Sequence, residues 1–293
     1  MNEKQNYDLF GNPIVEDVLL RDKFIEPPFS ILDTKTSSWQ NRKKQWSKIG
    51  IKSEIGRKAK SIIGGTDIYR SISKKEGYNN KDNYTSIFDP ALCEVLYHWF
   101  CPDNGSILDP FAGGSVRGIV ANKLGYKYTG IDIREEQVSS NYEQGNEILG
   151  DNCPKWICAD SNKELDNINN KFDFVFSCPP YADLEVYSDI DGDISNMSYN
   201  NFLNAYKSII NKSCSLLKDG GYACFVVGEV RDKNGGFYGF VPDTINSFIE
   251  SGMKYYNEAI LLNPVASASM RANGNMKTQK LVKIHQNVLV FKK

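Results

Sequence analysis

The sequence is poor in the residues that build metal and disulfide sites. It contains two histidines, His98 and His285, and its seven cysteines form no Cys-x-x-Cys pair. A tetrahedral zinc site needs closely spaced Cys and His ligands, so no metal site is predicted. We expect the cysteines to be reduced thiols, most of them packed as small apolar side chains.

Long apolar runs are also missing. No stretch approaches the roughly 20 residues that span a bilayer, and the N-terminal MNEKQNYDLF is too polar to predict a signal peptide. These absences favour a cytoplasmic protein. The composition, 41% hydrophobic and 24% charged over 293 residues, is ordinary for a globular chain with one large domain, or with one domain and an extension.

The net charge is only −1, but the charges are unevenly distributed. Between Lys35 and Lys81 there are thirteen basic residues and three acids, and the tail from Arg271 carries six basic residues and no acid. Acids concentrate in the middle of the chain. This distribution suits a polyanionic partner, so residues 35–81 and 271–293 are predicted to contact nucleic acid.

Regular elements are predicted from about residue 86 onward. Residues 1–85 are rich in Lys, Ser, Asn and Gly and lack a clear period. Beyond them, short apolar runs such as YKYTGIDI and FDFVFS alternate with helical stretches such as REEQVSSNYEQGNEIL. This alternation predicts an α/β fold, a doubly wound, mostly parallel, seven-stranded Rossmann-like sheet with helices on both faces. The predicted domains are a basic N-terminal extension, 1–85, and an α/β domain, 86–293.

Three acids follow successive predicted strands: Asp109 in ILDPFAGGSVRG, Asp132 in GID and Asp160 in CAD. The carboxyl ends of parallel strands meet at one edge of a sheet, where a turn with Gly113 lets a ligand approach the backbone. Carboxylates accept hydrogen bonds from ribose hydroxyls or a cationic amine and repel phosphate, which favours S-adenosylmethionine over a dinucleotide. Alternatively, Asp109 and Asp132 only cap the following turns.

A rigid corner, Cys178-Pro179-Pro180-Tyr181, ends the fourth predicted strand of the domain. Proline has no N–H donor, so the corner would present carbonyl oxygens without a competing donor. Acceptors aimed at a conjugated amino group favour the geometry in which its lone pair can react, and the Tyr181 ring could stack on a base. The alternative is a strand terminator whose tyrosine packs on the core.

With these two motifs in this order, the chain resembles the amino-group DNA methyltransferases, which methylate N4 of cytosine or N6 of adenine. DPFAGGS resembles their cofactor motif DPFAGSGT, with Ser115 replacing its second glycine. CPPY resembles their Asp/Asn/Ser-Pro-Pro-Tyr/Phe signature, with Cys178 at the first position. SSWQNRKKQW, VVGEVRD and KIHQNVLVFKK resemble segments of bacteriophage-encoded DNA methylases, so the expected setting is the cytoplasm of a bacterial or phage-infected cell.

The resemblance implies an enzyme that transfers a methyl group from S-adenosylmethionine to an exocyclic amino group of cytosine or adenine in DNA. Its implied catalytic residues are Cys178, Pro179, Pro180 and Tyr181. SIFDPALCEVLYHWF resembles a helix that supplies part of the cofactor wall. The implied cofactor-binding residues are Phe88, Asp89, Asp109, Pro110, Phe111, Gly113, Ser115, Asp132, Ile133, Asp160 and Ser161.

Several alternatives remain open at this point. Related folds methylate RNA or protein glutamine, and a degenerate corner would leave a non-catalytic subunit that binds S-adenosylmethionine and DNA. Because a thiol is a weak acceptor, Cys178 either replaces serine and leaves most of the work to the Pro179 carbonyl, or acts as a nucleophile.

Three further segments carry hypotheses. QNYDLF, residues 5–10, loosely resembles a peptide that docks on the replication sliding clamp. The acidic loop 182–198 is either a lid over the target base or a solvated loop with a helix cap near Ser198. Trp39 and Trp46 either stack on nucleic acid or pack against the α/β domain.

Overall fold

The computed structural model describes residues 19–51, 88–181, 190, 192–265 and 268–293, and the backbone of residues 60–61 and 185–186. The strands are β1 (Ile31–Asp33), β2 (Lys60–Ser61), β3 (Ser106–Asp109), β4 (Lys127–Asp132), β5 (Lys155–Cys158), β6 (Phe172–Ser177), β7 (Glu185–Val186), β8 (Leu217–Val227), β9 (Lys254–Leu262) and β10 (His285–Lys292). The α-helices are α1 (Leu20–Phe24), α2 (Ser37–Lys48), α4 (Pro90–Phe100), α5 (Val116–Lys123), α6 (Glu135–Leu149), α7 (Ser161–Glu164), α8 (Tyr199–Leu216), α9 (Phe240–Glu250) and α10 (Ala268–Met276). Short 3-10 turns are η1 (Leu165–Asn167) and η3 (Ile194–Asn196).

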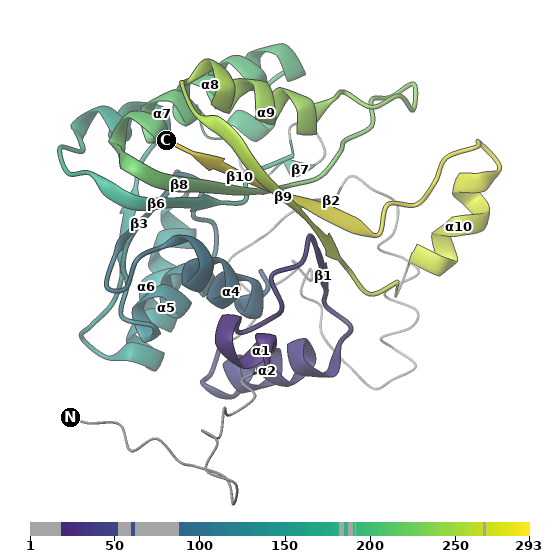
Figure 1. Cartoon of the computed structure of the whole chain (residues 1–293). Coiled ribbons are helices and arrows are strands. Elements are labelled where there is room, and N and C mark those ends of the chain that lie inside the picture. Colours follow the sequence, from purple (N-terminus) through teal and green to yellow (C-terminus); the bar gives the residue numbers. More distant parts are fainter. Residues whose placement is uncertain are drawn as a thin grey trace, which may run out of the picture.

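A mixed eight-stranded sheet forms the centre of the fold, in the order β1-β9-β10-β8-β6-β3-β4-β5 (Figure 1). β10 is antiparallel to β8 and β9, and the remaining pairs in this sheet are parallel. The mostly parallel α/β sheet predicted from the sequence is confirmed. Seven of these strands lie after residue 86, and the eighth, β1, comes from the predicted extension. A separate two-stranded ladder joins β2 to β7.

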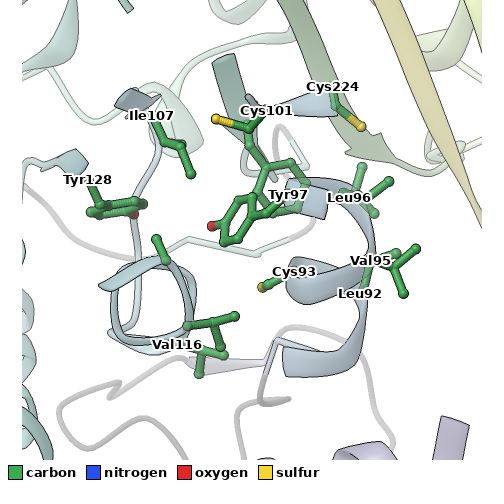
Figure 2. Packing of buried hydrophobic residues seen from close by; sticks show 14 of the residues in the cluster. Leu92, Cys93, Val95, Leu96, Tyr97, Cys101, Ile107, Val116, Tyr128 and Cys224 are labelled. Carbon is green, nitrogen blue, oxygen red and sulfur yellow. The ribbon is translucent and has the colours of Figure 1, made fainter. Parts of the chain in front are cut away.

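Helices cover both faces of the sheet because the central strands are apolar on both sides. On β3, Ile107 belongs to the core that α4, α5 and α6 cover, whereas its neighbour Leu108 belongs to the core under α8 and α9. This is the period of two expected for a strand buried on both faces. Figure 2 shows the first core, where Cys93 and Tyr97 of α4 point toward α5, the helix that begins at Val116.

Part of the predicted extension is built into this body. Strand β1 adds to the edge of the sheet, with Leu32 opposite Leu261 of β9. The next helix, α2, packs on α4: Trp39 is 1% exposed and donates from Nε1 to Asp89 at 3.1 Å. The packing alternative therefore holds for Trp39. Strand β1 has only three residues. This is too short for an alternating pattern, so β1 could not be predicted from the sequence.

Two basic residues of α2 face acids of the body. Arg42 Nη1 lies 2.7 Å from Glu94 Oε1, and Lys43 Nζ lies 3.3 Å from Asp89 Oδ2. Trp46 also donates to Glu94, at 2.6 Å. These pairs neutralise part of the positive charge predicted to contact nucleic acid. Residues 52–59 and 62–81 of the basic segment lie outside the described residues, as does the proposed clamp peptide at 5–10.

None of the helices in the described part of the chain is long and apolar enough to cross a membrane.

Replacing Glu94 by alanine should lower the free energy of unfolding by about 3 kcal/mol, because the change leaves the Arg42 charge and the Trp46 N–H without their buried acceptor. Urea unfolding measures the loss. Glu250→Ala is the matched control, since its ion pair with Lys207 is solvent-exposed and should matter by less than about 0.5 kcal/mol. Equal effects of the two changes would contradict the anchoring role of Glu94.

Candidate active site

A cavity of about 520 Å³ lies at the carboxyl ends of β3, β4, β5 and β6. It brings together most of the site residues predicted from the sequence. Those that line it are Phe88, Asp89, Pro110, Phe111, Gly113, Asp132, Ile133, Asp160, Ser161, Cys178, Pro179, Pro180 and Tyr181. Asp109 and Ser115 are not among the lining residues.

Asp109 is fully buried, with 0% of its side chain exposed. Oδ2 accepts hydrogen bonds from Arg117 Nε at 2.5 Å and from the Tyr128 hydroxyl at 2.7 Å. Oδ1 accepts from the Ser177 hydroxyl at 2.5 Å and from the Phe111 backbone N–H at 3.2 Å. These donors occupy the roughly four lone-pair positions of a carboxylate. The expected contact of Asp109 with a ligand amine is therefore corrected: Asp109 holds the turn from inside the protein.

Arg117 is a buried cation that sequence reasoning missed. It lines the cavity beside the Phe88 ring, whose centre is 4.7 Å from the guanidinium carbon. Nη2 donates to the carbonyls of Phe111 and Ala112 at 2.6 and 2.7 Å. Burial acts to lower the pKa of Arg117, but the Asp109 carboxylate raises it, and the resulting pKa is well above the ordinary value. The guanidinium stays charged, and Asp109 neutralises it.

Burial, and secondarily the Asp109 charge, raise the pKa of Tyr128 well above its ordinary value. Its hydroxyl therefore remains a donor to Asp109 at every physiological pH. The one signal of this cluster in the sequence is an arginine within the small and apolar stretch GSVRGIVA.

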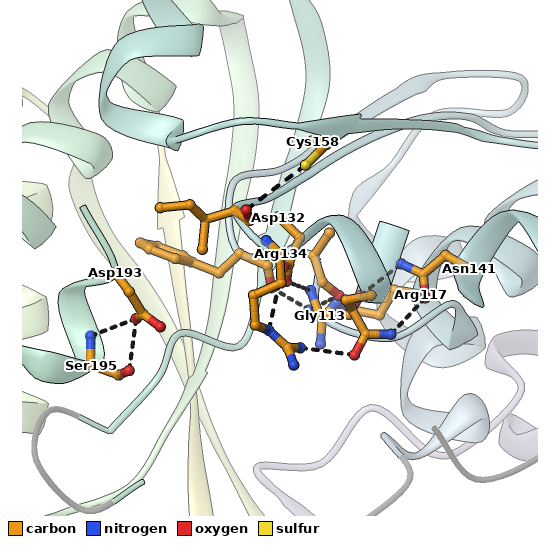
Figure 3. A network of polar contacts seen from close by, with 12 residues as sticks. Gly113, Arg117, Asp132, Arg134, Asn141, Cys158, Asp193 and Ser195 are labelled. Carbon is orange, nitrogen blue, oxygen red and sulfur yellow. Dashed lines mark hydrogen bonds and ion pairs between the residues drawn. The ribbon is translucent and has the colours of Figure 1, made fainter. Parts of the chain in front are cut away.

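A polar face of α6 holds the Gly-rich turn in place (Figure 3). Asn141 Nδ2 donates to the Gly113 carbonyl at 2.7 Å, and Gln144 accepts from the Ser115 hydroxyl at 2.7 Å. Ser115, predicted to contact the cofactor, instead ties the turn to the helix. Gly113 has a φ of 51°, in the left-handed region that favours glycine.

Asp132 both caps this turn and reaches the cavity. Oδ2 accepts from the Gly113 N–H at 3.0 Å, and Oδ1 accepts from the Arg134 N–H at 2.9 Å. The side chain is 13% exposed and lines the cavity. The capping alternative is thus correct for Asp132 without excluding a ligand contact, which stays a prediction.

At the end of β5, Asp160 caps α7 by accepting from the Asn162 N–H at 2.8 Å, and the Ser161 hydroxyl donates to the Pro110 carbonyl at 2.6 Å. The described end of the candidate lid loop lies beside them, because a Cβ added at Gly192 would come within 3.2 Å of Asp160 Oδ2. Gly192, Asp193 and Ile194 line the cavity. Residues 182–184, 187–189 and 191 of the loop lie outside the described residues.

The Pro-Pro-Tyr corner ends β6 at the cavity. The Tyr181 hydroxyl accepts from Gln286 Nε2 at 2.7 Å, and its ring meets that of Phe240 edge-on at 6.0 Å. Tyr181 therefore packs on the core and also forms part of the cavity wall. Cys178 is half-buried and is not part of a disulfide.

Both ends of the chain contribute to the cavity, which the sequence analysis did not predict. Thr34, Gln40 and Lys43 come from the N-terminal segment. Leu261, Asn263, Pro264 and Gln286 come from β9, the residues after it, and β10. These residues are far from the motifs in the sequence, so their place in the cavity could not be predicted from local pattern. It depends on β1 and β10 both pairing with β9.

The chemistry of this cavity fits S-adenosylmethionine better than a dinucleotide. Its volume is within the roughly 300–1,000 Å³ of small-molecule sites. The carboxylates of Asp132, Asp160 and Asp89 would repel a pyrophosphate, while they can accept from ribose hydroxyls, an adenine amine or an ammonium. Among the described residues, no group of three or more His, Cys, Asp or Glu is placed to hold a metal ion.

Comparison with known proteins bears on the family. Residues 12–143 match the model of a family described as DNA methylase, which confirms the resemblance found from the motifs. The match contains the Gly-rich turn and Asp132 and ends before the Pro-Pro-Tyr corner. No curated protein matches the sequence closely enough to count as a relative.

Solved structures that this chain resembles include several methyltransferases. TrmN from Thermus thermophilus is 14% identical to this chain, with a TM-score of 0.48. The match covers 70% of this chain and 49% of TrmN, so this chain spans about half the length of TrmN. Magnesium protoporphyrin IX methyltransferase from Synechocystis, with bound SAM, is 14% identical with a TM-score of 0.45, over 78% of this chain and 91% of that one. TehB from Haemophilus influenzae is 16% identical with a TM-score of 0.43, over 76% and 65%. Similarity this distant does not bear on the substrate.

Asp109→Asn should lower the free energy of unfolding by about 3–5 kcal/mol, because it leaves the Arg117 guanidinium buried without its counter-charge. Combining it with Arg117→Met should recover part of the loss, since the double change removes both charges. Urea denaturation of the two variants tests this. A loss below about 1 kcal/mol for Asp109→Asn would contradict the central role of the pair.

Proposed function

We propose that this chain transfers a methyl group from S-adenosylmethionine to an exocyclic amino group of cytosine or adenine in DNA. The observation that carries the proposal is that the Gly113 turn, Asp132 and the Pro-Pro-Tyr corner line one cavity. The DNA methylase match over residues 12–143 supports it. The corner, which lies outside the match, adds the chemistry suited to an amino group.

On the cofactor side, Asp132 would accept hydrogen bonds from the ribose hydroxyls, and Ile133 and Asp160 would lie against the adenine. Phe111 and Gly113 would border the methionine part. When bound, S-adenosylmethionine supplies an electrophilic methyl group on a sulfonium sulfur. The turn needs no rearrangement to present these groups, because Asn141 and Asp132 already hold its backbone from both sides.

On the target side, the amino group of a base is a poor nucleophile because its lone pair is delocalised into the ring. The carbonyl oxygen of Pro179 would accept from its N–H and favour the reactive, pyramidal geometry, with no donor on Pro179 or Pro180 to compete. The thiol of Cys178 is a weak acceptor and adds little. The Tyr181 ring, held by Gln286 and Phe240, would stack on the extruded base.

The connection from β9 to β10 supplies a surface for the phosphate backbone. It carries α10 away from the sheet (Figure 1), and the sequence contains no acid after Glu258. Arg271 and Lys277 are exposed on it. Asn263 at its start and Gln286 just beyond its end line the cavity. Nucleic acid bound to this connection would thus lie beside the proposed target site.

Incubation of the purified protein with methyl-labelled S-adenosylmethionine and DNA, RNA or protein tests the proposal directly. We expect label in DNA, and mass spectrometry of digested DNA would identify the methylated base. Transfer to RNA or to protein glutamine alone would replace the proposed substrate. Cofactor binding without transfer to any of the three would indicate a non-catalytic subunit.

Tyr181→Ala should lower methyl transfer by up to about a hundredfold, since stacking on an aromatic ring contributes roughly 1–3 kcal/mol per base. Affinity for S-adenosylmethionine, measured by calorimetry, should be nearly unchanged. Tyr181→Phe is the control because it keeps the ring and removes the hydroxyl that accepts the hydrogen bond from Gln286. Parallel loss of transfer and cofactor affinity in Tyr181→Ala would remove Tyr181 from the target side.

The double change Arg271→Ala/Lys277→Ala should weaken DNA binding and reduce the slope of log affinity against log salt by about two, because each phosphate contact contributes about 0.9 in duplex DNA. Fluorescence anisotropy at several salt concentrations measures both. Lys123→Ala/Lys155→Ala is the control: both lysines are exposed, and Lys155 begins β5 at the opposite edge of the sheet. Equal slopes for the two variants would contradict the proposed surface.

A further inference from the structure

One wall of the cavity comes from the N-terminal segment, and its position is fixed by hydrogen bonds. The Thr34 hydroxyl donates to the Leu262 carbonyl at the end of β9, at 2.8 Å. Gln40 Nε2 donates to the Thr34 carbonyl at 2.6 Å. Thr34, Gln40 and Lys43 all line the cavity. Because Gln40 and Lys43 are three residues apart on α2, they occupy neighbouring positions on one side of this helix.

Lys43 places a positive charge in this wall. Its Nζ lies 3.3 Å from Asp89 Oδ2, and its side chain is 40% exposed, against 14% for Asp89. An ammonium has three N–H donors, and the hydrogen bond to Asp89 uses one. The amine is therefore held near the cavity and retains donors for a ligand.

Asp89 is a fixed partner for this lysine. Its Oδ1 accepts from the Ala91 N–H at 3.0 Å, as the N-cap of α4, and its Oδ2 also accepts from Trp39 Nε1 at 3.1 Å. With Lys43, these donors account for three of the roughly four lone-pair positions of the carboxylate. One position is left for a further donor at the cavity wall.

The described lining residues include three cations, Lys43, Arg117 and Arg134. Arg117 is neutralised by the buried Asp109. Arg134 Nε is 3.7 Å from Asp132, at the end of the cavity proposed for the ribose. Lys43 is thus the lining cation beside Asp89, so one positive and one negative group lie together in this part of the cavity wall.

We infer that Lys43 and Asp89 bind the amino-acid end of S-adenosylmethionine, with Lys43 on its carboxylate and Asp89 on its ammonium. The inference rests on the proposed use of this cofactor. A zwitterion matches a wall that carries both charges, since each ligand group gains a charge-assisted hydrogen bond. A lysine within a basic segment that suggested nucleic-acid contact thereby becomes part of the cofactor site.

The affinities of three ligands distinguish the Lys43 contact with the carboxylate from the Asp89 contact with the ammonium. The ligands are S-adenosylmethionine, its decarboxylated form, which keeps the ammonium, and 5′-methylthioadenosine, which lacks both groups. In calorimetry, Lys43→Ala should weaken S-adenosylmethionine binding about tenfold or more, because hydrogen bonds to charged groups contribute about 1.5–3 kcal/mol. Its affinity for the other two ligands should not fall. Asp89→Asn should weaken binding of both ligands that carry the ammonium and spare methylthioadenosine.

Two controls accompany these variants. Lys44→Ala removes an exposed lysine next along α2 and should change none of the three affinities. Lys43→Arg keeps the charge and should retain most of the affinity for S-adenosylmethionine. Methylthioadenosine binding to each variant reports whether the cavity is intact, so misfolding cannot imitate the selective loss.

Equal weakening of all three ligands by Lys43→Ala, or undiminished affinity for S-adenosylmethionine, would overturn the inference. The outcome is independent of methyl transfer. A wild-type protein that binds the cofactor but methylates no DNA would overturn the proposed function and leave the Lys43 contact standing. A wild-type protein without affinity for S-adenosylmethionine would overturn both.

Discussion

The buried carboxylate of Asp109 is the contact on which the rest of the site depends. It ends β3 and receives donors from Tyr128 on β4, Ser177 on β6 and Arg117 on α5. Burying a carboxylate away from solvent costs free energy unless donors satisfy its lone pairs. The elements that carry these donors must therefore meet at Asp109. Arg117 in turn binds the carbonyls of the Gly-rich turn. The buried Asp109–Arg117 ion pair thus fixes the position of the turn that forms the floor of the cavity.

Acidic and basic residues occupy different places around the cavity. Acids at strand ends face the cavity, where a ligand with hydroxyl and amine donors can satisfy them. Exposed basic residues lie on the β9–β10 connection, whose two ends reach the same cavity. The proposed DNA substrate would therefore find its basic contacts at the rim, and the strand-end acids would disfavour its phosphates inside the cavity. The pairing of Lys43 with Asp89 shows that a basic residue can belong to the crevice when an acid holds it there.

Strand pattern and turn chemistry placed Gly113, the strand-end acids and the Pro-Pro-Tyr corner at one edge of the sheet, and the family resemblance supplied the other predicted residues that line the cavity. Strands buried on both faces read as short apolar runs, and in a parallel sheet the residues after them gather at one edge. The predicted ligand contacts were wrong for two polar residues whose side chains can bind either a ligand or the protein itself. Asp109 and Ser115 have the side chains of ligand contacts, yet both bond inward, to Arg117 and Gln144. Sequence alone does not report which way a polar side chain at a turn points.

By itself, the sequence determined the α/β alternation, the order of the motifs and the donor-free corner at Pro179 and Pro180, because these follow from local periodicity and from the chemistry of single residues. Only the tertiary structure decided that β1 joins the sheet beside β9, that Trp39 is buried, and that Lys43 and Gln286 reach the cavity. Those outcomes depend on contacts between residues far apart in the chain, where burial and charge pairing decide among partners that no local pattern distinguishes.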